Sequence, residues 1–255
     1  MNTNRKLAFI TGATSGIGKA TAIKFAEIGW NLVITGRRSQ RLDELKSYIE
    51  ENQPSKVITS CFDVRDRNSI IKALEQLPDE TKKADVLLNN AGLALGREPL
   101  QEGNPEQWQT MIDTNIMGLM HMSSLLIPYL IQRQDAMIIN VSSVAGKEAY
   151  PGGNVYSASK FAVEGITKSM RLDLLPFGIR VASIAPGAAV TEFSKVRFGG
   201  DEEKAAAVYK GFQPLLPEDI ADVIVFMATR PPHVCLQDIQ IMPTAQANSS
   251  TILRK

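Results

Sequence analysis

The sequence has few of the residues from which proteins build disulfide frameworks or metal sites. Its 255 residues include two cysteines and two histidines. Cys61 and Cys235 lie far apart without CxxC spacing, and neither His121 nor His233 has a partner at ligand or triad spacing. We therefore expect no disulfide scaffold and no metal site, and a reducing compartment fits this composition best.

Long apolar runs and a strong charge imbalance are also missing. No apolar run approaches the roughly 18 residues of a membrane-spanning helix, and "MNTNRKLAFITG" lacks the features of a signal peptide. The net charge of +1 gives no electrostatic reason to expect nucleic acid or an anionic membrane as a partner. We therefore expect a cytoplasmic protein that acts on a small molecule.

Short apolar runs alternate with longer segments of helical period along the whole chain. The runs predicted as buried strands are 7–11, 31–36, 56–62, 85–90, 137–143, 179–186 and 239–242. The segments predicted as helices are 16–29, 39–51, 66–77, 105–132 and 154–177. This alternation predicts an α/β fold, a doubly wound parallel sheet covered by helices on both faces, in a single domain over 1–255.

A glycine-rich turn, "TGATSGIG", follows the first predicted strand. Gly12, Gly16 and Gly18 are spaced GxxxGxG rather than the commoner GxGxxG. Glycines at this turn let the backbone approach a pyrophosphate, while the next helix points its N-terminus at the phosphates. The turn indicates a dinucleotide site, although an ordinary strand-to-helix turn is the alternative.

The second predicted strand ends in "TGRRSQR", which bears on the choice of cofactor. Sites that prefer NAD place an acidic residue about here to hold the ribose hydroxyls, but this chain has Gly36, followed by Arg37 and Arg38. Guanidinium groups bind a ribose phosphate through charge-assisted hydrogen bonds, whereas a carboxylate would repel it. The pattern favours NADP, and a solvated helix start is the alternative.

The stretch "YSASK" places Tyr156 and Lys160 one turn apart on the same face of a predicted helix. A phenol has an ordinary pKa near 10, and bringing it close to neutrality requires about 4 kcal/mol of differential stabilisation of the phenolate. A neighbouring ammonium group can contribute to that stabilisation. The pair therefore suggests proton transfer, although an isolated YxxxK can equally lie on an exposed helix.

The motifs "TGATSGIG", "NNAG", "NVSS", "YSASK" and "PGAAVT" occur in the order and spacing typical of the short-chain dehydrogenase/reductase family, which this sequence resembles. The resemblance implies a seven-stranded Rossmann-type domain and a catalytic tetrad of Asn115, Ser143, Tyr156 and Lys160. Tyr156 would be the acid or base, Ser143 would bind the substrate oxygen, and Lys160 would support the phenolate and hold the nicotinamide ribose. Asn115 would kink its helix and hold a water.

The same resemblance implies a set of cofactor contacts. Asp63 would bind adenine with help from the Val64 amide, and the segment after the sixth strand would meet the nicotinamide. The full set of expected contacts is Gly12, Thr14, Ser15, Gly16, Ile17, Gly18, Arg37, Arg38, Asp63, Val64, Asn90, Ala91, Gly92, Tyr156, Lys160, Pro186, Gly187, Ala189 and Thr191.

Segments such as "NNAGLALG", "GGNVYSASK" and "TEFSKVRF" resemble the NADP-dependent 3-hydroxy acid dehydrogenase branch, whose substrates include L-allo-threonine, serine and 3-hydroxypropionate or malonic semialdehyde. We expect the substrate segment at about 188–215 and the substrate carboxylate at Arg197, with Lys147 and Arg97 as weaker candidates. An ordinary surface or interface role for Arg197 is the alternative.

Other functions remain open from the sequence. A 3-oxoacyl-carrier-protein reductase or another short-chain carbonyl reductase would share the tetrad, although the tail lacks a "DGG"-like strand. The segment "KVRFGGDEEK" is more polar than a steroid dehydrogenase would favour. A noncatalytic NADP-binding regulator is a further alternative. The resemblance also implies a homo-oligomer, with a tetramer favoured, through helices 105–132 and 154–177.

Overall fold

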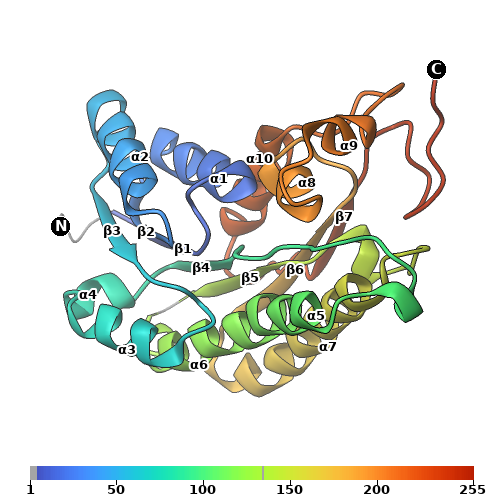
Figure 1. The fold of residues 1–255 in the computed structure, drawn as a ribbon. Helices are drawn as coiled ribbons and strands as arrows, with labels where there is room; N and C mark the ends of the chain where they lie inside the picture. Colours follow the sequence, from blue (N-terminus) through green and yellow to red (C-terminus); the bar gives the residue numbers. More distant parts are fainter. Residues whose placement is uncertain (1–4, 134) are drawn as a thin grey trace.

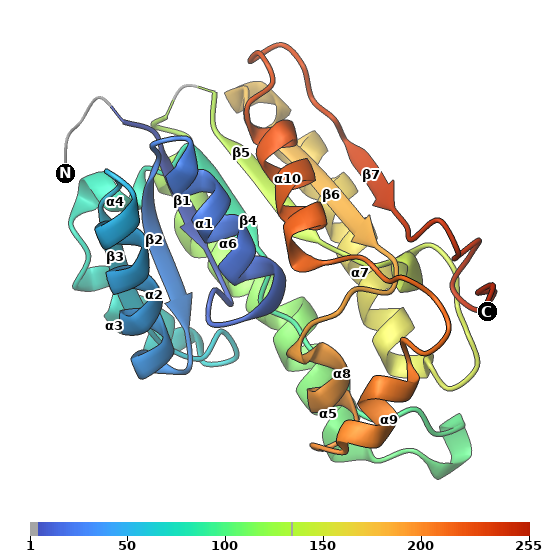
Figure 2. The same cartoon turned by 90° about the horizontal axis from the view of Figure 1, so that it is seen from above.

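The fold is built on one sheet of seven parallel strands. The computed structural model describes residues 5–133 and 135–255. The strand order is β3-β2-β1-β4-β5-β6-β7, and every neighbouring pair is parallel (Figures 1 and 2). The fold class predicted from the sequence is confirmed. Residues 1–4, which begin the stretch used to predict a cytoplasmic location, lie outside the described residues, as does residue 134.

The strands form where short apolar runs can be buried on both faces. Their bounds are β1 Leu7–Ile10, β2 Asn31–Gly36, β3 Val57–Cys61, β4 Val86–Asn89, β5 Met137–Val141, β6 Arg180–Pro186 and β7 Asp238–Ile241. The central strands are buried along their whole length, but β7 alternates between exposed and half-buried residues. The prediction of a buried seventh strand is therefore wrong, because β7 lies at the edge of the sheet and pairs, among the described strands, with β6 alone.

Helices cover both faces of the sheet, with α1, α2 and α10 on one side and α3, α4, α6 and α7 on the other (Figure 1). The helices are α1 Gly16–Glu27, α2 Ser39–Asn52, α3 Arg67–Glu75, α4 Asp79–Lys82, α5 Pro105–Ile112, α6 Gly118–Leu130, α7 Asn154–Leu174, α8 Glu192–Arg197, α9 Glu202–Ala207 and α10 Pro217–Ala228. Short 3₁₀ turns cover Leu100–Glu102, Val144–Gly146 and Leu175–Phe177.

Two apolar cores lie above and below the sheet. Successive residues of a strand point to opposite faces, so Ile10 packs in the core beneath α1, α2 and α10, and Phe9 packs in the core beneath α3 and α6. Both side chains are fully buried. The twofold periodicity of the strands therefore accounts for the two layers of helices.

The long helix predicted over 105–132 is interrupted. A π turn over Asp113–Met117 separates α5 from α6. Such turns insert an extra residue into a helix and often occur at functional sites. Asn115, a predicted tetrad member, lies in this turn.

Three helices after the sixth strand are absent from the sequence predictions. Helices α8 and α9 have six residues each, too few to show a clear helical period. Helix α10 carried a readable start signal, because Pro217 occupies its first turn and the Asp219 side chain accepts a hydrogen bond from the Leu216 amide at 2.8 Å. Figure 2 places α8 and α9 beyond the carboxyl ends of the strands.

The position of the site follows from the strand order. The order of the strands reverses between β1 and β4, and a crevice forms at such a switch point, outside the carboxyl ends of the strands. The glycine turn after β1, the end of β4 and the segment after β5 therefore converge there. No helix among the described residues is both long and apolar enough to cross a membrane.

A chain of buried hydrogen bonds joins the two central strands to the helices beneath them. Asn89 of β4 donates to Asn140 of β5 at 2.8 Å and to Ser123 of α6 at 3.0 Å. Asn140 donates in turn to Thr167 of α7 at 2.9 Å. All four side chains are buried, and the Thr167 hydroxyl also donates to the Val163 carbonyl at 2.7 Å, so each side chain is hydrogen-bonded within the protein.

We expect Asn140→Ala to lower the free energy of unfolding by about 1–3 kcal/mol, because it removes two buried side-chain hydrogen bonds that contribute about 0.5–1.5 kcal/mol each. Urea denaturation followed by circular dichroism measures the change. The matched control is Asn52→Ala, which removes an exposed asparagine that donates to the Tyr48 carbonyl, and it should stay within about 0.5 kcal/mol of the original chain. Equal effects of the two substitutions would contradict the role given to Asn140.

Candidate active site

One pocket at the carboxyl ends of the strands collects nearly all of the residues that the sequence singled out. It is bounded by the turns after β1, β2, β4, β5 and β6 and by helix α8. Predicted residues that line it are Gly12, Thr14, Ser15, Gly16, Ile17, Arg37, Arg38, Asp63, Val64, Asn90, Ala91, Gly92, Ser143, Tyr156, Lys160, Pro186, Gly187, Ala189, Thr191 and Arg197. Gly18 and Asn115 lie behind this lining.

The glycine turn is shaped for close approach of backbone. Gly12 has a φ of 67°, and a Cβ there would lie 2.9 Å from the Cα of Ala91. Gly16 has a φ of 52° and begins α1, so the N-terminus of that helix points into the pocket. A Cβ at Gly18 would collide with the Asn90 side chain. Gly18 thus serves the packing of α1 against the end of β4, rather than the lining of the pocket.

Arg38 lies at the end of the pocket next to β2. Its guanidinium donates to Thr14 Oγ1 at 2.7 Å and to Ser15 Oγ at 3.0 Å. It also donates to the carboxylate of Glu192 at 2.8 Å, and Arg41 donates to the same carboxylate at 2.5 Å. The turn after β1, the start of α2 and the start of α8 are therefore joined through one guanidinium.

These arginines change the ionisation of Glu192. Partial burial alone would raise the pKa of this carboxyl, but hydrogen bonds and the charges of Arg38 and Arg41 lower it to about 2. Glu192 is therefore ionised throughout the physiological range. Its side chain is also 40% exposed, so solvent screens the ion pairs and each contributes little to stability.

Asp63 and Arg37 lie together on the same side of the pocket. Asp63 accepts two hydrogen bonds from the Arg65 guanidinium, at 3.0 and 2.7 Å, and lies 3.7 Å from Arg37. Burial acts to raise the pKa of Asp63, but the hydrogen bonds to Arg65 and the charges of Arg65 and Arg37 lower it overall. The carboxylate predicted to bind adenine thus also orients an arginine predicted to bind phosphate.

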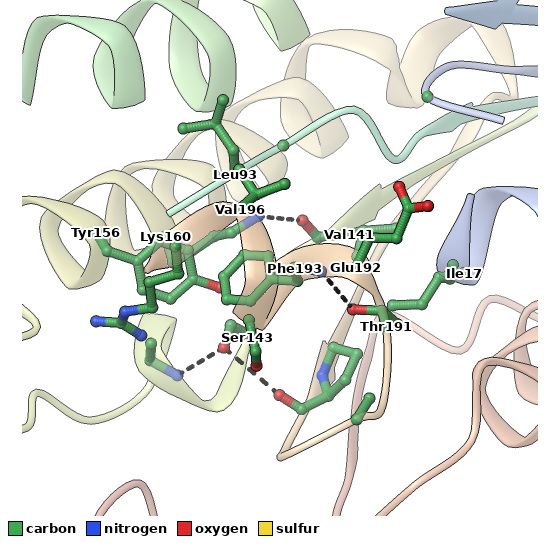
Figure 3. A pocket seen from close by; sticks show the side chains of 18 of the residues that line it. Ile17, Leu93, Val141, Ser143, Tyr156, Lys160, Thr191, Glu192, Phe193 and Val196 are labelled. Carbon is green, nitrogen blue, oxygen red and sulfur yellow. Dashed lines mark hydrogen bonds between the residues drawn. The ribbon is translucent and has the colours of Figure 1, made fainter. Parts of the chain in front are cut away.

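Tyr156 and Lys160 lie on the buried face of α7, 8% and 6% exposed. The Lys160 Nζ lies 5.9 Å from the centre of the Tyr156 ring and donates to the Val141 carbonyl at 2.9 Å. Ser143 follows the end of β5, and its hydroxyl accepts a hydrogen bond from the Ala145 amide at 3.1 Å. Figure 3 shows Ser143 and Tyr156 facing the same cavity, with Phe193 beside them.

Burial is the largest influence on the pKa values of Tyr156 and Lys160. It raises the pKa of the Tyr156 phenol above its ordinary value, while a hydrogen bond with Ser143 and the charge of Arg197 act to lower it. Burial lowers the pKa of Lys160 to about 8, and the charge of Glu164, one turn further along α7, acts to raise it. The lysine can therefore gain or lose a proton close to neutral pH.

Asn115 lies between Lys160 and the end of β4. Its side chain accepts a hydrogen bond from the Leu93 amide at 2.8 Å and donates to the Leu93 carbonyl at 2.8 Å and to Ser159 Oγ at 3.0 Å. A Cβ at Gly92 would lie 3.2 Å from the Asn115 Oδ1 and 3.5 Å from the Lys160 Nζ. The π turn thus brings an amide close to the lysine without placing it in the pocket lining.

The far end of the pocket contains an arginine and a tyrosine with unpaired polar atoms. Arg197 of α8 donates through Nε to the Gly96 carbonyl at 3.0 Å, and its guanidinium carbon lies 5.4 Å from the Tyr150 ring and 5.6 Å from the Tyr156 ring. The Arg197 Nη2 and the Tyr150 hydroxyl are buried and have no hydrogen-bond partner within the described part of the chain. Two donors are thus available at the end of the pocket that Tyr156 lines.

The two weaker candidates for binding the substrate carboxylate, Arg97 and Lys147, differ in position. Arg97 lines the pocket near Tyr150, with its guanidinium carbon 5.8 Å from that ring. Lys147 lies outside the lining and is bound at 2.7 Å to both Glu164 and Asp238. Lys147 therefore connects α7 to the edge strand, and the candidates that remain at the pocket are Arg97 and Arg197.

Sequence reasoning missed three residues that shape the site. Arg41 ends the quoted stretch "TGRRSQR" and Glu192 lies in "TEFSKVRF", but neither residue was given a role, and Tyr150 belongs to no segment considered there. Arg41 lies one turn after Arg38, which was a readable signal for a shared face. The sequence contains no such signal for Glu192 and Tyr150, because their partners are far away along the chain. Within residues 5–133 and 135–255, no three His, Cys, Asp or Glu side chains are grouped to hold a metal ion.

The residues present fit a phosphorylated dinucleotide. The glycine turn gives backbone access to a helix N-terminus, as a pyrophosphate requires. No acidic side chain occupies the end of β2, where Gly36 packs so closely on Thr14 that a Cβ would lie 2.6 Å from its methyl group. Arg37 and Arg38 flank that position, and the cationic edge suits a ribose phosphate.

Comparison with known proteins agrees with this geometry. A family model described as short chain dehydrogenase matches residues 6–201. The chain is similar to sulfoacetaldehyde reductase 2 of Chromohalobacter salexigens, with 45% identity over 96% of each protein. It is also similar to the NADP-dependent 3-hydroxy acid dehydrogenase of Salmonella typhi, with 43% identity over 94% of this chain and 96% of that protein.

Among solved structures, the chain is similar to the closed form of serine dehydrogenase complexed with NADP+. The two share 39% identity and a TM-score of 0.90, over 98% of this chain and 99% of that one.

Glu192→Gln tests whether this carboxylate competes with a ribose phosphate for Arg38 and Arg41. We expect the variant to bind NADP about two- to fivefold more tightly, the range corresponding to an exposed ion pair, and to bind NAD with little change. Titration followed by protein fluorescence or calorimetry measures both affinities. Weaker NADP binding in the variant would contradict competition and would mean that Glu192 supports the phosphate site.

Proposed function

Because the chain belongs to the short-chain dehydrogenase family, we propose that it is an NADP-dependent oxidoreductase that transfers hydride between the cofactor and a 3-hydroxy acid. The observation that carries this proposal is the common pocket. Ser143, Tyr156 and Lys160 line it together with the glycine turn at one end and the unpaired Arg197 donor at the other.

The proposed cofactor contacts follow the pocket from β2 to β6. Arg37 and Arg38 would hold the ribose phosphate, the amides around Gly16 the pyrophosphate, and Lys160 the nicotinamide ribose. Bound NADP supplies the group that accepts or donates the hydride. The segment from Pro186 to Thr191 lines the pocket beside Ser143 and would meet the nicotinamide.

The proposed proton transfer belongs to Tyr156. In oxidation, the phenolate would accept the proton of the substrate hydroxyl while the carbon that bears this hydroxyl gives a hydride to the cofactor. In reduction, the phenol would return the proton to the substrate oxygen. Burial alone keeps the phenol protonated, so the reaction needs positive charge beside it. Lys160 on the same helix face and the oxidised nicotinamide are the proposed sources.

Ser143 and Asn115 have supporting roles in this proposal. The Ser143 hydroxyl would donate to the substrate oxygen and stabilise the negative charge that develops there. Asn115, held by Leu93 and Ser159, would keep the π turn in place beside Lys160. Its hydrogen bonds support a positioning role rather than contact with the substrate.

The substrate carboxylate is proposed to bind Arg197, with Tyr150 as a second donor. The guanidinium carbon lies 5.6 Å from the Tyr156 ring, so the site suits a short substrate with its anionic group close to the reacting hydroxyl. A 3-oxoacyl thioester is neutral near the reacting carbonyl and would leave the buried Arg197 Nη2 without a hydrogen-bond partner. This supports a small hydroxy acid over the acyl-carrier alternative.

A second candidate function is the reduction of sulfoacetaldehyde. The observation that favours it is that the two unpaired donors, Arg197 Nη2 and Tyr150 Oη, suit a sulfonate as well as a carboxylate. The relative named for this activity is 45% identical over 96% of this chain. The same tyrosine and serine would perform the proton transfer and bind the carbonyl oxygen.

Several wider expectations belong to the same proposal. We propose one cofactor-binding domain over 1–255 with the substrate segment at about 188–215, which includes α8 and α9. A cytoplasmic location and a homotetramer formed through α5, α6 and α7 remain predictions from the sequence and its family.

Tyr156→Phe removes the proposed acid and base and leaves the ring in place. We expect kcat to fall by about 10²–10⁴-fold, with NADP binding retained. Steady-state NADPH formation with 3-hydroxypropionate measures the loss. The control is Tyr48→Phe on the exposed side of α2, which should turn over at the normal rate. Turnover by Tyr156→Phe within threefold of the original rate would contradict the proposed role of Tyr156 as acid and base.

Arg197→Met removes the guanidinium and keeps an aliphatic side chain against Tyr150 and Tyr156. Loss of a charge-assisted hydrogen bond corresponds to a KM for the hydroxy acid that is about 10–100-fold higher, while the Kd of NADP should change little. Lys195→Met, on the same helix but paired outward with Glu202, is the matched control. An unchanged KM in Arg197→Met would remove this arginine from the substrate site.

A further inference from the structure

We propose that two charges outside the pocket lining, the Glu164 carboxylate and the Lys147 ammonium, control the charge of Lys160 and thereby the pH range of proton transfer. Glu164 is a positioning residue in this proposal, because it lies outside the lining and acts through Lys160. The inference rests on the proposed function, since the charge of Lys160 matters to catalysis only if Tyr156 transfers the proton.

Tyr156, Lys160 and Glu164 follow one another at intervals of four residues along α7. This spacing places neighbouring members of the row on the same helix face, with a rise of about 6 Å between them. All three side chains are buried, with exposed fractions of 8%, 6% and 5%. A carboxylate buried one turn from an ammonium favours the charged form of that ammonium.

Lys160 has no carboxylate bound to it directly. Its Nζ donates to the last backbone carbonyl of β5 at 2.9 Å, and it forms no ion pair with a described residue. The π turn beside it presents the uncharged Asn115 amide, and the carboxylate of that turn, Asp113, accepts a hydrogen bond from Gln109 at 2.8 Å. Glu164 is therefore the acidic group whose charge opposes the effect of burial on the pKa of Lys160.

Two further titratable groups act on Tyr156 rather than on Lys160. Arg197 of α8 lies 5.6 Å from the Tyr156 ring, and its charge acts to lower the pKa of the phenol. Tyr150, from the segment before α7, acts to raise it. The elements packed around the reactive pair thus bring a cation to the phenol and a carboxylate to the lysine.

Lys147 and Ser183 hold the Glu164 carboxylate on one side. Glu164 Oε2 accepts hydrogen bonds from Lys147 Nζ at 2.7 Å and from Ser183 Oγ at 3.1 Å. Glu164 Oε1 is buried and has no hydrogen-bond partner in the described part of the chain. The negative charge is therefore only partly compensated by its bonded neighbours, and the remainder acts along the helix on Lys160.

Lys147 is shared with a second carboxylate. Its Nζ lies 2.7 Å from both oxygens of Asp238 on the edge strand β7. The exposed fraction of these charged side chains rises outward, from 7% for Glu164 to 20% for Lys147 and 44% for Asp238. The charges alternate in sign from Lys160 outward, and solvent screens the buried end least. Glu164 and Lys147 therefore have opposite effects on Lys160.

Two substitutions separate the effect of charge from that of structure. Glu164→Gln keeps the shape of the side chain and removes the negative charge, so we expect it to lower the pKa of Lys160 by about half a unit or more. Lys147→Met removes the positive charge that compensates Glu164 and should raise that pKa by a similar amount. Glu75→Gln and Lys72→Met, both exposed on α3, are the matched controls and should leave it unchanged.

The measurement is a pH titration followed by NMR, on protein labelled with 13C at the lysine Cε and free of ligands. The Lys160 resonance is assigned by its absence from Lys160→Met. Because burial lowers the pKa of Lys160 to about 8, this resonance should titrate below those of exposed lysines, whose ordinary pKa is about 10.4. The readout requires no turnover.

The same reversal of sign is expected in the pH profile of the proposed reaction. Reduction uses the phenol form of Tyr156, which burial keeps protonated, so kcat/KM with NADPH should decline as Lys160 loses its proton. The midpoint of this decline should move to lower pH in Glu164→Gln and to higher pH in Lys147→Met. The substrates are malonic semialdehyde and sulfoacetaldehyde.

Opposite shifts of the Lys160 resonance in the two variants would support the inference. Shifts in the same direction, or none, would overturn it and leave the proposed function standing, with the ion pairs serving only to join α7 to β7. Shifts of the resonance without shifts of the pH profile would overturn the link to proton transfer. If the original chain reduces neither aldehyde, the proposed function fails, and the NMR titration still decides whether Glu164 and Lys147 control Lys160.

Asp238→Asn keeps the inference testable if Glu164→Gln fails to fold. Asp238 lies at the exposed end of the row, and its substitution leaves the buried carboxylate in place. Removing its charge should lower the pKa of Lys160, by less than Glu164→Gln would. A raised pKa in this variant would contradict the alternating arrangement of charges.

Discussion

The site depends on the burial of one face of α7 against the end of β5. Tyr156 and Lys160 lie on that face, and the bond from Lys160 to the Val141 carbonyl fixes the helix to the strand at the point where Ser143 follows. One junction therefore positions the phenol, the ammonium and the serine hydroxyl together. The Asn89–Asn140–Thr167 chain fastens the same helix to the two central strands, so sheet packing and site geometry have a common support.

Much of this arrangement was accessible from the sequence, because it rests on local patterns. Alternating apolar runs and helical segments predict the parallel sheet, and the family membership and fold class are confirmed. A glycine turn after β1 and a tyrosine four residues before a lysine on α7 are readable without coordinates. The carboxyl ends of parallel strands then bring these segments together, since all such ends lie at one edge of the sheet.

Features that depend on contacts between distant segments could not be predicted from the sequence. Glu192 meets Arg38 across an interval of 154 residues, and Arg197 meets Gly96 across 101. No periodicity or spacing carries that information. The short helices α8 and α9 were missed for a related reason, because six residues are too few for a pattern. The exposed edge strand β7 was misread as buried, since its apolar residues resemble those of the inner strands.

In the proposed site, the ion pairs of Glu192 would link cofactor binding to substrate binding. Because α8 carries both Glu192 and Arg197, a ribose phosphate that drew Arg38 away from Glu192 would also change the contacts that hold this helix beside the proposed substrate site. By linkage, such coupling is reciprocal, so a substrate anion on Arg197 would alter cofactor affinity by the same factor. In the proposed site, engineering the cofactor preference through Arg38 or Arg41 would therefore change substrate affinity as well.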